Sequence, residues 1–329
     1  MKGRSILSLE DLSTDEIEFL LELAARFGDE GIPAAHPGKN VCGLFFNPSM
    51  RTRTAVELAS AALGAHPLIH DVGGGVWNLE TVDGAVMDGD KAEHIKDAVG
   101  KFLSGVVDAI GVRSFADMSR SFDENRQDDV LHAVARAASV PVFSLESAMF
   151  HPMQGLADLL VLRNHLLGDP EEHTIAVTWA YHPRPLPMAV AHTALLGFAR
   201  AGYRVRLVHP EGFELDGEVV QRAREVAGDR LSIHHNMDDG LTGANVIYAK
   251  SWGSQHEYGG AAIARDAHRD WIVDGRRQAF GKPGAFMHCL PVRRNVVVTD
   301  EVIDGPHSWV AEQARSRVLT QAAVLHEVL

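Results

Sequence analysis

The densest group of chemically capable side chains is Ser49-Met50-Arg51-Thr52-Arg53, which directly follows the apolar run Leu44–Phe46. Asn47, Pro48 and Ser49 suit a turn and the N-cap of a helix, so a strand is expected to end here and a helix to begin. The exposed N–H groups and positive dipole end of such a helix attract anions, and arginine forks fit phosphate oxygens. The pattern predicts a phosphate site. The alternative is a solvated helix start whose arginines pair with carboxylates such as Glu57.

Three further groups of polar residues also lie at expected strand ends. Arg113 follows Val106–Val112, a run that is apolar except for Asp108 and is of the kind buried in parallel sheets, and ligands of open α/β sheets bind at this edge. His151-Pro152-Met153-Gln154 follows the expected strand Val140–Leu145, and His288-Cys289-Leu290-Pro291 ends a strand that begins at Ala285. Each group alone is weak evidence, because a histidine at a helix start or a strand end is common.

Composition limits the classes of function. The chain has 329 residues, which predicts two domains, and a formal charge of -13, which argues against nucleic acid or a membrane surface as partner. Two distant cysteines suit a reducing compartment, and we expect a cytoplasmic protein without a metal or organic cofactor. There is no G-x-G-x-x-G motif, Walker A sequence or nucleophile elbow, so neither a dinucleotide site nor covalent catalysis is expected.

Alternating strand and helix signals predict an α/β fold with two doubly wound parallel-sheet domains and the active site in the cleft between them. We expect the first domain to cover residues 1–147 and the second 148–310, with a closing helix at about 311–329 packed back on the first. The expected helices include 13–27, 90–103, 128–138, 188–201 and 217–226. The expected strands are 38–46, 67–72, 106–112, 140–145, 174–179, 204–208, 246–250 and 285–291.

The polar groups at 49–53, 151–154 and 288–293, in this order and together with Arg113 and Arg317, resemble the aspartate and ornithine carbamoyltransferase family over nearly the whole chain. The resemblance implies attack of an amine on the carbonyl carbon of carbamoyl phosphate, through a tetrahedral oxyanion that expels phosphate. It also implies a homotrimer in which the loop Gly73–Trp77 reaches a neighbouring subunit's active site. The alternative for Trp77 is that it folds back on its own domain.

The resemblance assigns roles to individual residues. Thr52, Arg113 and His151 are the expected catalytic residues, because they would meet the carbonyl oxygen as it becomes an oxyanion. Gln154 and the backbone carbonyls of Cys289 and Leu290 would accept hydrogen bonds from the carbamoyl NH2. The full carbamoyl phosphate set is Ser49, Met50, Arg51, Thr52, Trp77, Arg113, His151, Gln154, Cys289, Leu290, Arg293 and Arg317.

A second group of motifs resembles the N-acylornithine branch of the family. Tyr248-Ala249-Lys250 and Thr178–Pro185 match that branch, and the Ser-Met-Gly stretch of ordinary ornithine enzymes is absent. A blocked α-amine leaves a carboxylate that suits Lys250, with His182 and Glu146 orienting the rest of the substrate. The alternative for Lys250 is a surface lysine.

The residue at position 92 bears on which acyl group the substrate carries. The acetylornithine type has a glutamate at this point and the succinylornithine type has proline, so a small residue predicts N-succinyl-L-ornithine as substrate, with Arg184 or a neighbouring cation pairing its distal carboxylate. Leu145–Ala148 and Val208–Gly212 also match the succinyl type, whereas Met153 and Ala92 itself depart from the usual residues. N-acetyl-L-ornithine is the alternative substrate. A paralogue that binds carbamoyl phosphate without turnover is the alternative outside enzymes, and a dehydrogenase is disfavoured.

Overall fold

The computed structural model describes residues 1–329 and divides into two compact units. Unit 1 comprises Met1–Ala116, Asn125–Met153 and Arg317–Leu329, and unit 2 comprises Asp117–Glu124 and Gln154–Ser316. The expected domain boundaries differ from these by a few residues, because α6 (Pro152–His165) and α12 (Val310–Val328) each run across a boundary.

The segment Asp117–Glu124 belongs to unit 2, which the sequence did not indicate. The Gly259 N–H donates to the Met118 carbonyl at 3.1 Å, and Phe122 packs edge-on against Tyr258 with ring centroids 5.1 Å apart. These contacts attach the segment to a part of the chain far away in sequence.

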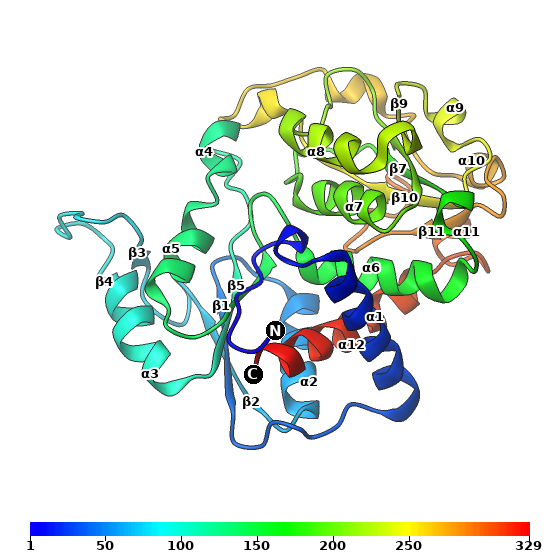
Figure 1. The fold of residues 1–329 in the computed structure, drawn as a ribbon. Coiled ribbons are helices and arrows are strands. Elements are labelled where there is room, and N and C mark those ends of the chain that lie inside the picture. The colour runs from blue at the N-terminus through cyan, green and yellow to red at the C-terminus, as the bar shows by residue number, and fades with distance from the viewer. The chain divides into compact units, whose positions relative to one another are not determined.

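Unit 1 is built on a parallel sheet of order β2-β1-β5-β6 (Figure 1). Its strands are β1 (Asn40–Phe45), β2 (His66–Asp71), β5 (Ala109–Arg113) and β6 (Val142–Glu146). The register pairs Phe45 with Arg113 and Arg113 with Glu146. The carboxyl ends of three strands therefore meet at one edge, and α2 (Met50–Ala62) begins beside it.

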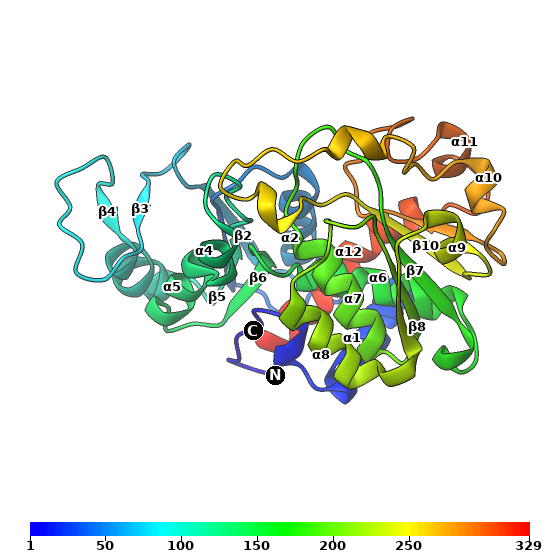
Figure 2. The ribbon, with the colours of Figure 1, turned by 90° about the horizontal axis from the view of Figure 1, so that it is seen from above.

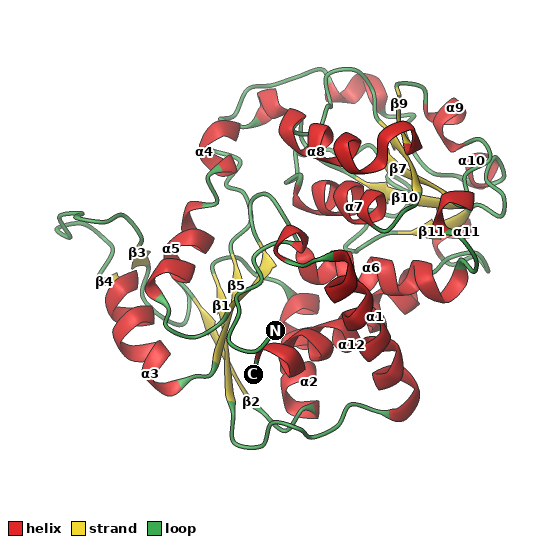
Figure 3. Ribbon diagram, in the orientation of Figure 1, coloured by secondary structure: helices red, strands yellow, loops and turns green.

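Helices cover both faces of the unit 1 sheet, as Figure 3 shows with helices in red and strands in yellow. One face carries α1 (Thr14–Glu30), α2 and the unit 1 part of α12. The other carries α5 (Asp129–Ala137) and a π-helix at Lys96–Leu103 that continues into α3 (Ser104–Val106), packed on a core that includes Val99, Leu103, Ile110 and Val134.

The expected helix 90–103 begins later than predicted, at Lys96. The residues before it form β4 (Glu93–His94), which pairs in parallel with β3 (Leu79–Glu80). Figure 2 shows these short strands on an arm that extends away from the unit 1 sheet. The strand expected from Val106 begins only at Ala109, because the helix occupies residues 104–106.

Unit 2 holds a second parallel sheet, of order β11-β10-β7-β8-β9 (Figure 1). Its strands are β7 (Thr174–Trp179), β8 (Arg204–Val208), β9 (Leu231–His234), β10 (Val246–Lys250) and β11 (Ala285–Met287). β9 was not predicted, because Leu231–His234 is short and lies at the sheet edge. The helices are α7 (Ala189–Arg200), α8 (Gly217–Ala227), α9 (Met237–Leu241), α10 (Gly275–Gln278) and α11 (Asp300–Ile303), while α4 (Phe122–Arg126) lies at a unit boundary.

Two parallel doubly wound sheets confirm the predicted fold class. Among the helices, none combines the length and apolar character that crossing a membrane requires.

Candidate active site

The start of α2 has the geometry predicted for an anion site. Ser49 is the N-cap, with extended backbone angles of φ -159° and ψ 118°, and its hydroxyl accepts from the Thr52 N–H at 3.2 Å. Met50 is 75% exposed, so the first helical turn reaches the surface of unit 1 beside it. N–H groups at this end therefore lie where an anion can approach.

A chain of five side chains in unit 1, which we call the Thr52–Arg113 cluster, brings the predicted catalytic residues together. Arg317 Nη2 donates a hydrogen bond to Thr52 Oγ1 at 2.7 Å, and the same nitrogen lies 3.5 Å from His151 Nε2. His151 Nε2 lies 3.7 Å from Glu146 Oε2, and the same carboxylate oxygen pairs with Arg113 Nη1. All but the half-buried Glu146 are buried.

The sheet register explains this cluster. Arg113 and Glu146 are partners on adjacent parallel strands, with a register shift just before Arg113, so their side chains leave the same edge. The cluster contains the guanidiniums of Arg113 and Arg317, and Arg113 is the one that pairs with the Glu146 carboxylate. The Arg113 Nε atom is buried and has no hydrogen-bond partner within the chain. Such an arrangement suits a bound anion or a developing oxyanion.

Glu146 was assigned to the acylornithine, and the structure places it against Arg113 and His151. Glu146 therefore orients the two neighbouring side chains, which sequence reasoning did not foresee.

Arg53 differs from the expectation that both arginines surround one anion. Its Nη2 donates to Asp71 Oδ2 at 2.7 Å, and its guanidinium lies over the Phe45 ring at 5.7 Å from the centroid. Residues two apart on a helix point about 200° apart, so Arg51 and Arg53 cannot face the same ligand. Arg53 thus has the carboxylate partner that the alternative interpretation predicted, although that partner is Asp71 and not Glu57.

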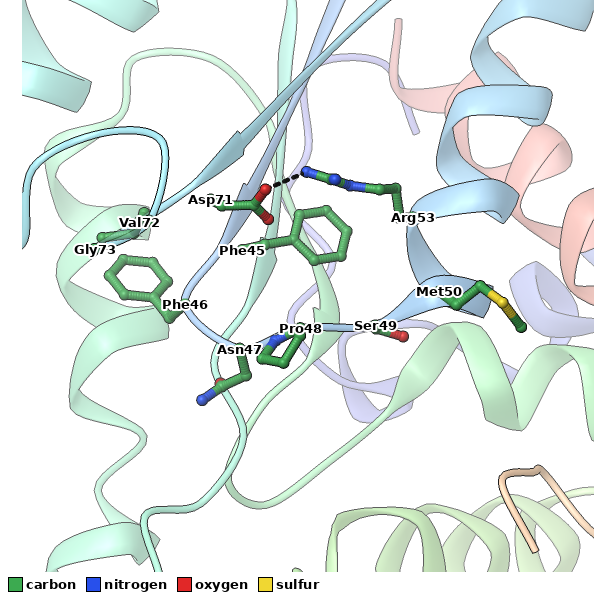
Figure 4. A pocket seen from close by; sticks show the side chains of 11 residues that line it. Phe45, Phe46, Asn47, Pro48, Ser49, Met50, Arg53, Asp71, Val72 and Gly73 are labelled. Atoms are coloured by element: carbon green, nitrogen blue, oxygen red, sulfur yellow. Dashed lines mark hydrogen bonds and ion pairs between the residues drawn. The ribbon is translucent and has the colours of Figure 1, made fainter.

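A cavity of about 510 Å³ lies between the start of α2 and the glycine loop (Figure 4). The dashed contact between Arg53 and Asp71 lies along it. The lining residues are Phe45, Phe46, Asn47, Pro48, Ser49, Met50, Arg53, Asp71, Val72, Gly73 and Gly74. Ser49 and Met50 are the predicted carbamoyl phosphate residues in this lining, and no member of the Thr52–Arg113 cluster is among the lining residues.

The glycine loop, Gly73–Trp77, begins with a hydrogen-bonded turn. The Asp71 carbonyl accepts from the N–H groups of Gly74, Gly75 and Val76 at 3.1, 2.8 and 3.1 Å. Gly73 has φ +78°, and a Cβ there would lie 2.3 Å from Asn78 Oδ1, so a glycine is needed. Trp77 follows this turn and is 70% exposed, so it does not fold back on unit 1.

In unit 2, His182 organises a group of positive charges. Arg293 Nε lies 2.9 Å from His182 Nε2, and His182 Nδ1 lies 2.7 Å from the Arg184 carbonyl. Because Arg293 can only donate, Nε2 must accept, and the hydrogen on Nδ1 is then donated to that carbonyl. Burial lowers the pKa of His182, and the nearby charges of Arg293, Lys250 and Arg265 lower it further. The imidazole is therefore neutral at pH 7.

Of these cations, Arg265 is paired with Glu257, whereas Arg293 and Lys250 make no ion pair within the chain. Lys250 ends β10 and donates to the Ser251 carbonyl at 3.0 Å. Arg293 was predicted to contact carbamoyl phosphate, and the structure places it beside His182 and near Lys250. Two unneutralised cations beside a neutral histidine suit a carboxylate.

Arg184 and Ala92 are both exposed. Arg184 makes no ion pair within the chain, and Ala92 lies on the arm directly before β4, next to Lys91, which pairs with Glu80 at 3.2 Å. Neither side chain belongs to the groups described above, although the Arg184 backbone contacts His182, and the two residues lie in different units.

The segment after β11 has an unusual backbone. Leu290 has φ +56°, a left-handed conformation that residues with a Cβ rarely adopt and that costs about 1–3 kcal/mol. Its N–H donates to His288 Nδ1 at 2.9 Å, while the His288 N–H donates to Gln313 Oε1 at 2.9 Å. Backbone strain of this kind is common at functional sites. The residue types Cys289 and Leu290 do not predict it.

Sequence reasoning also missed Asp158 and Gln313. Gln154 Nε2 and Gln313 Nε2 donate to Asp158 Oδ1 at 2.7 and 2.6 Å, and all three residues are buried. The available signal was the i, i+4 spacing of Gln154 and Asp158 on a helix. The chain contains no group of three or more His, Cys, Asp or Glu side chains placed to hold a metal ion.

Two family descriptions match this chain. "Aspartate/ornithine carbamoyltransferase, carbamoyl-P binding domain" matches residues 4–164, and "Aspartate/ornithine carbamoyltransferase, Asp/Orn binding domain" matches residues 187–328.

Curated relatives agree with this match. The chain is 39% identical to the N-acetylornithine carbamoyltransferase of Xanthomonas campestris pv. campestris, over 99% of this chain and 97% of the relative. It is 37% identical to the N-succinylornithine carbamoyltransferase of Bacteroides fragilis, over 88% of this chain and 87% of the relative.

Solved structures are similar along the whole length. A crystal structure of acetylornithine transcarbamylase complexed with acetylcitrulline matches with a TM-score of 0.95 at 36% identity, covering 99% of each chain. A variant of N-acetyl-L-ornithine transcarbamylase with one glutamate replaced by proline, complexed with carbamyl phosphate and N-succinyl-L-norvaline, matches with a TM-score of 0.95 at 37% identity, covering 99% of this chain and 100% of that one.

Proposed function

Because this chain belongs to the aspartate/ornithine carbamoyltransferase family, in its N-acylornithine branch, we propose that it transfers the carbamoyl group of carbamoyl phosphate to the side-chain amine of N-succinyl-L-ornithine. The products would be N-succinyl-L-citrulline and phosphate. The observation that supports transfer best is the Thr52–Arg113 cluster, because it gathers several hydrogen-bond donors beside the anion-binding start of α2.

Phosphate would bind at the first turn of α2, held by Ser49, the N–H groups of the turn and Arg51. The carbonyl oxygen would face Arg113, His151 and Thr52. Thr52 Oγ1 accepts from Arg317, so its own hydrogen is directed elsewhere and serves a developing oxyanion. One well-placed donor of this kind contributes about 2.7–4 kcal/mol to the transition state.

The attacking amine must lose its proton. An alkyl amine with a pKa near that of lysine, about 10.4, is neutral in only about one molecule in a thousand at pH 7. Positive charge from Lys250 and Arg293 in the amine-binding unit favours the neutral form. The departing phosphate accepts the amine proton as the C–N bond forms, so no protein base is needed.

Lys250 and Arg293 would bind the α-carboxylate of the acylornithine, and neutral His182 would hold Arg293 in place. Ala92 supports the succinyl group. A glutamate at this position would repel a distal carboxylate by about 4 kcal/mol at about 4 Å and an effective dielectric near 20. Arg184, which has no carboxylate partner within the chain, is a candidate to pair that carboxylate.

The solved neighbours support this argument. Variants of the acetylornithine enzyme in which one glutamate is replaced by proline, alanine, serine or valine are each complexed with N-succinyl-L-norvaline. We take that glutamate to be the one that aligns with Ala92. N-acetyl-L-ornithine is the second candidate, favoured by the higher identity and fuller coverage of the acetylornithine relative.

A substrate panel tests the proposal. N-succinylornithine, N-acetylornithine and ornithine are assayed with carbamoyl phosphate, and we expect the highest kcat/KM for N-succinylornithine. Preference for N-acetylornithine would establish the second candidate. Binding of carbamoyl phosphate without turnover of any amine would indicate a binding paralogue.

Ala92→Glu tests the role of charge. It should lower kcat/KM for N-succinylornithine by about a hundredfold or more and spare N-acetylornithine, because the repulsion acts only on the distal carboxylate. Ala92→Gln has the same size without the charge and should have a much smaller effect. Equal losses in the two variants would show that bulk, and not charge, matters at this position.

A further inference from the structure

One buried carboxylate connects three parts of unit 2 that the proposed function uses. Asp158 lies on α6 and is 1% exposed. Its Oδ1 accepts from Gln154 Nε2 at 2.7 Å and Gln313 Nε2 at 2.6 Å, and its Oδ2 accepts from the Tyr248 hydroxyl at 2.8 Å. All four side chains are buried, so each of these hydrogen bonds is shielded from water.

Each partner adjoins a group expected to contact substrate. Gln154 is the expected acceptor for the carbamoyl NH2. Tyr248 lies two residues before Lys250 on β10. Gln313 Oε1 accepts from the His288 N–H at 2.9 Å, directly before the Cys289 and Leu290 carbonyls.

The chemistry of a carboxylate decides which way the two amides point. A glutamine side chain has an NH2 end that only donates and an oxygen that only accepts. Asp158 Oδ1 accepts from both glutamines, so it selects the orientation in which Gln154 and Gln313 present NH2 to it. The oxygen of Gln154 must then point away from Asp158, and that of Gln313 points to His288.

We propose that Asp158 is a positioning residue that fixes the Gln154 amide with its oxygen toward the carbamoyl NH2, and so makes the enzyme prefer carbamoyl phosphate to acyl phosphates without that NH2. This rests on the proposed role of Gln154. A site built to bind a substrate N–H group rejects analogues that lack it, because its acceptor then stays unsatisfied. If the Gln154 amide could rotate, its NH2 would face the carbamoyl NH2, and the preference for carbamoyl phosphate would fall.

The test compares carbamoyl phosphate with acetyl phosphate, which has a methyl group in place of the NH2. Asp158→Leu removes the acceptor and should lower kcat/KM for carbamoyl phosphate by about tenfold to a hundredfold, the usual effect of losing one hydrogen bond to a charged group. The inhibition constant of acetyl phosphate should change less than about twofold, because its recognition does not involve Gln154.

Asp158→Asn is the conservative control. Its oxygen can accept from both amides while its NH2 is donated to the Tyr248 hydroxyl oxygen, so it should keep most of the preference. Asp216→Ala is the stability control, because Asp216 is also 1% exposed in unit 2 but caps α8 through Glu218 and Val219. It should lower Tm and leave the preference unchanged.

Equal weakening of both phosphates by Asp158→Leu would overturn the proposal and leave Asp158 a structural residue. If Asp158→Leu does not fold, Asp158→Ser, which is too short to reach the amides, is measured in the same way. Binding of both phosphates is also followed by the rise in Tm, which needs no amine substrate. Failure of the proposed function, seen as no turnover of any acylornithine, is therefore distinguishable from failure of this inference.

Discussion

The arginines of unit 1 show that a side chain's role depends on the element that carries it. Arg113 leaves the carboxyl end of β5 and pairs with Glu146, whereas Arg53 leaves α2 and pairs with Asp71. Arg113 is buried, and Arg53 retains 37% of its side-chain exposure. Coulombic attraction is stronger where water is excluded, so Arg113 can contribute to catalysis far more than Arg53 can.

Truncation of Arg51 and truncation of Lys250 should weaken the binding of different substrates. Arg51→Ala should raise KM for carbamoyl phosphate, and Lys250→Ala should raise KM for the acylornithine, because we assign them to different substrates in different units. Loss of a charge-assisted contact costs about 1.5–3 kcal/mol, or about tenfold to a hundredfold on the matching substrate. Steady-state kinetics with each substrate varied in turn measures both constants.

Arg53→Ala is the matched control for this comparison. Since Arg53 pairs with Asp71 and is partly exposed, its loss should change either constant by less than about threefold. If Arg51→Ala and Lys250→Ala affected the same constant, the assignment of the two residues to different substrates would be wrong.

The sequence named several side chains without revealing which residues surround them. Thr52, Arg113, His151 and Arg317 were expected site residues from their places at strand ends or from the resemblance, and the structure brings all four into one cluster. The position of Glu146 in that cluster depends on the register of β5 with β6, which no local motif encodes. Asp158 was missed for the same reason, since two of its three partners lie about ninety and about one hundred and fifty residues away.

At the scale of elements, strands with clear apolar runs were predicted accurately, and β7, β8 and β10 have the predicted bounds. The largest difference is at residues 90–95, where Lys91, Ala92 and Glu93 have high helix propensity. The structure instead pairs Glu93–His94 with Leu79–Glu80 on the arm. A nonlocal contact overrode local propensity there, which a single sequence cannot show.

The start of α1 provides a test of element stability with pH. Ser13 and Glu16 form a capping box, and Glu16 also pairs with Arg4 at 2.6 Å. The Arg4 contact, followed by the Ser13 N–H, lowers the pKa of Glu16 from 4.5 to about 2. A carboxyl group whose pKa is lower in the folded than in the unfolded protein stabilises the fold at pH values above the unfolded pKa. This stabilisation is lost as the pH falls from 4.5 to about 2.

Glu16→Gln keeps the hydrogen bond to Ser13 but loses the charge pair. At pH 7 it should lower Tm by less than about 3 °C, because the pair is partly exposed. The difference from the parent protein should shrink as the pH falls toward 2. Asp15→Asn, in the same turn without an ion pair, is the control. A difference that stays constant from pH 7 to pH 3 would contradict the linkage.

At the scale of the whole molecule, the charge of -13 and the local clusters of arginine have opposite signs. A negative protein surface does not attract anionic substrates, so positive charge must be concentrated where they bind. Each unit contains one such concentration of positive charge: the Thr52–Arg113 cluster lies in unit 1 and the His182 group in unit 2. Composition predicted two domains, but the assignment of 117–124 to unit 2 required contacts that only the folded chain reveals.

The exposure of Trp77 bears on how the subunits assemble into an oligomer. Trp77 is 70% exposed at the end of a hydrogen-bonded glycine turn, so its indole is accessible to a neighbouring subunit. We propose that the chain forms a homotrimer in which Trp77 completes a neighbour's carbamoyl phosphate site. A monomer with full activity at low concentration would contradict this.

Subunit mixing provides the decisive measurement. Trp77→Ala and Arg113→Ala proteins, each weakly active, are unfolded, mixed in equal amounts and refolded together. In a ring of three with shared sites, about a quarter of the sites receive both intact residues, so about a quarter of parental activity should return. Mixing Arg113→Ala with His151→Ala should restore nothing, because both residues belong to the cluster of a single chain. Equal activity in the two mixtures would show that Trp77 acts within its own subunit.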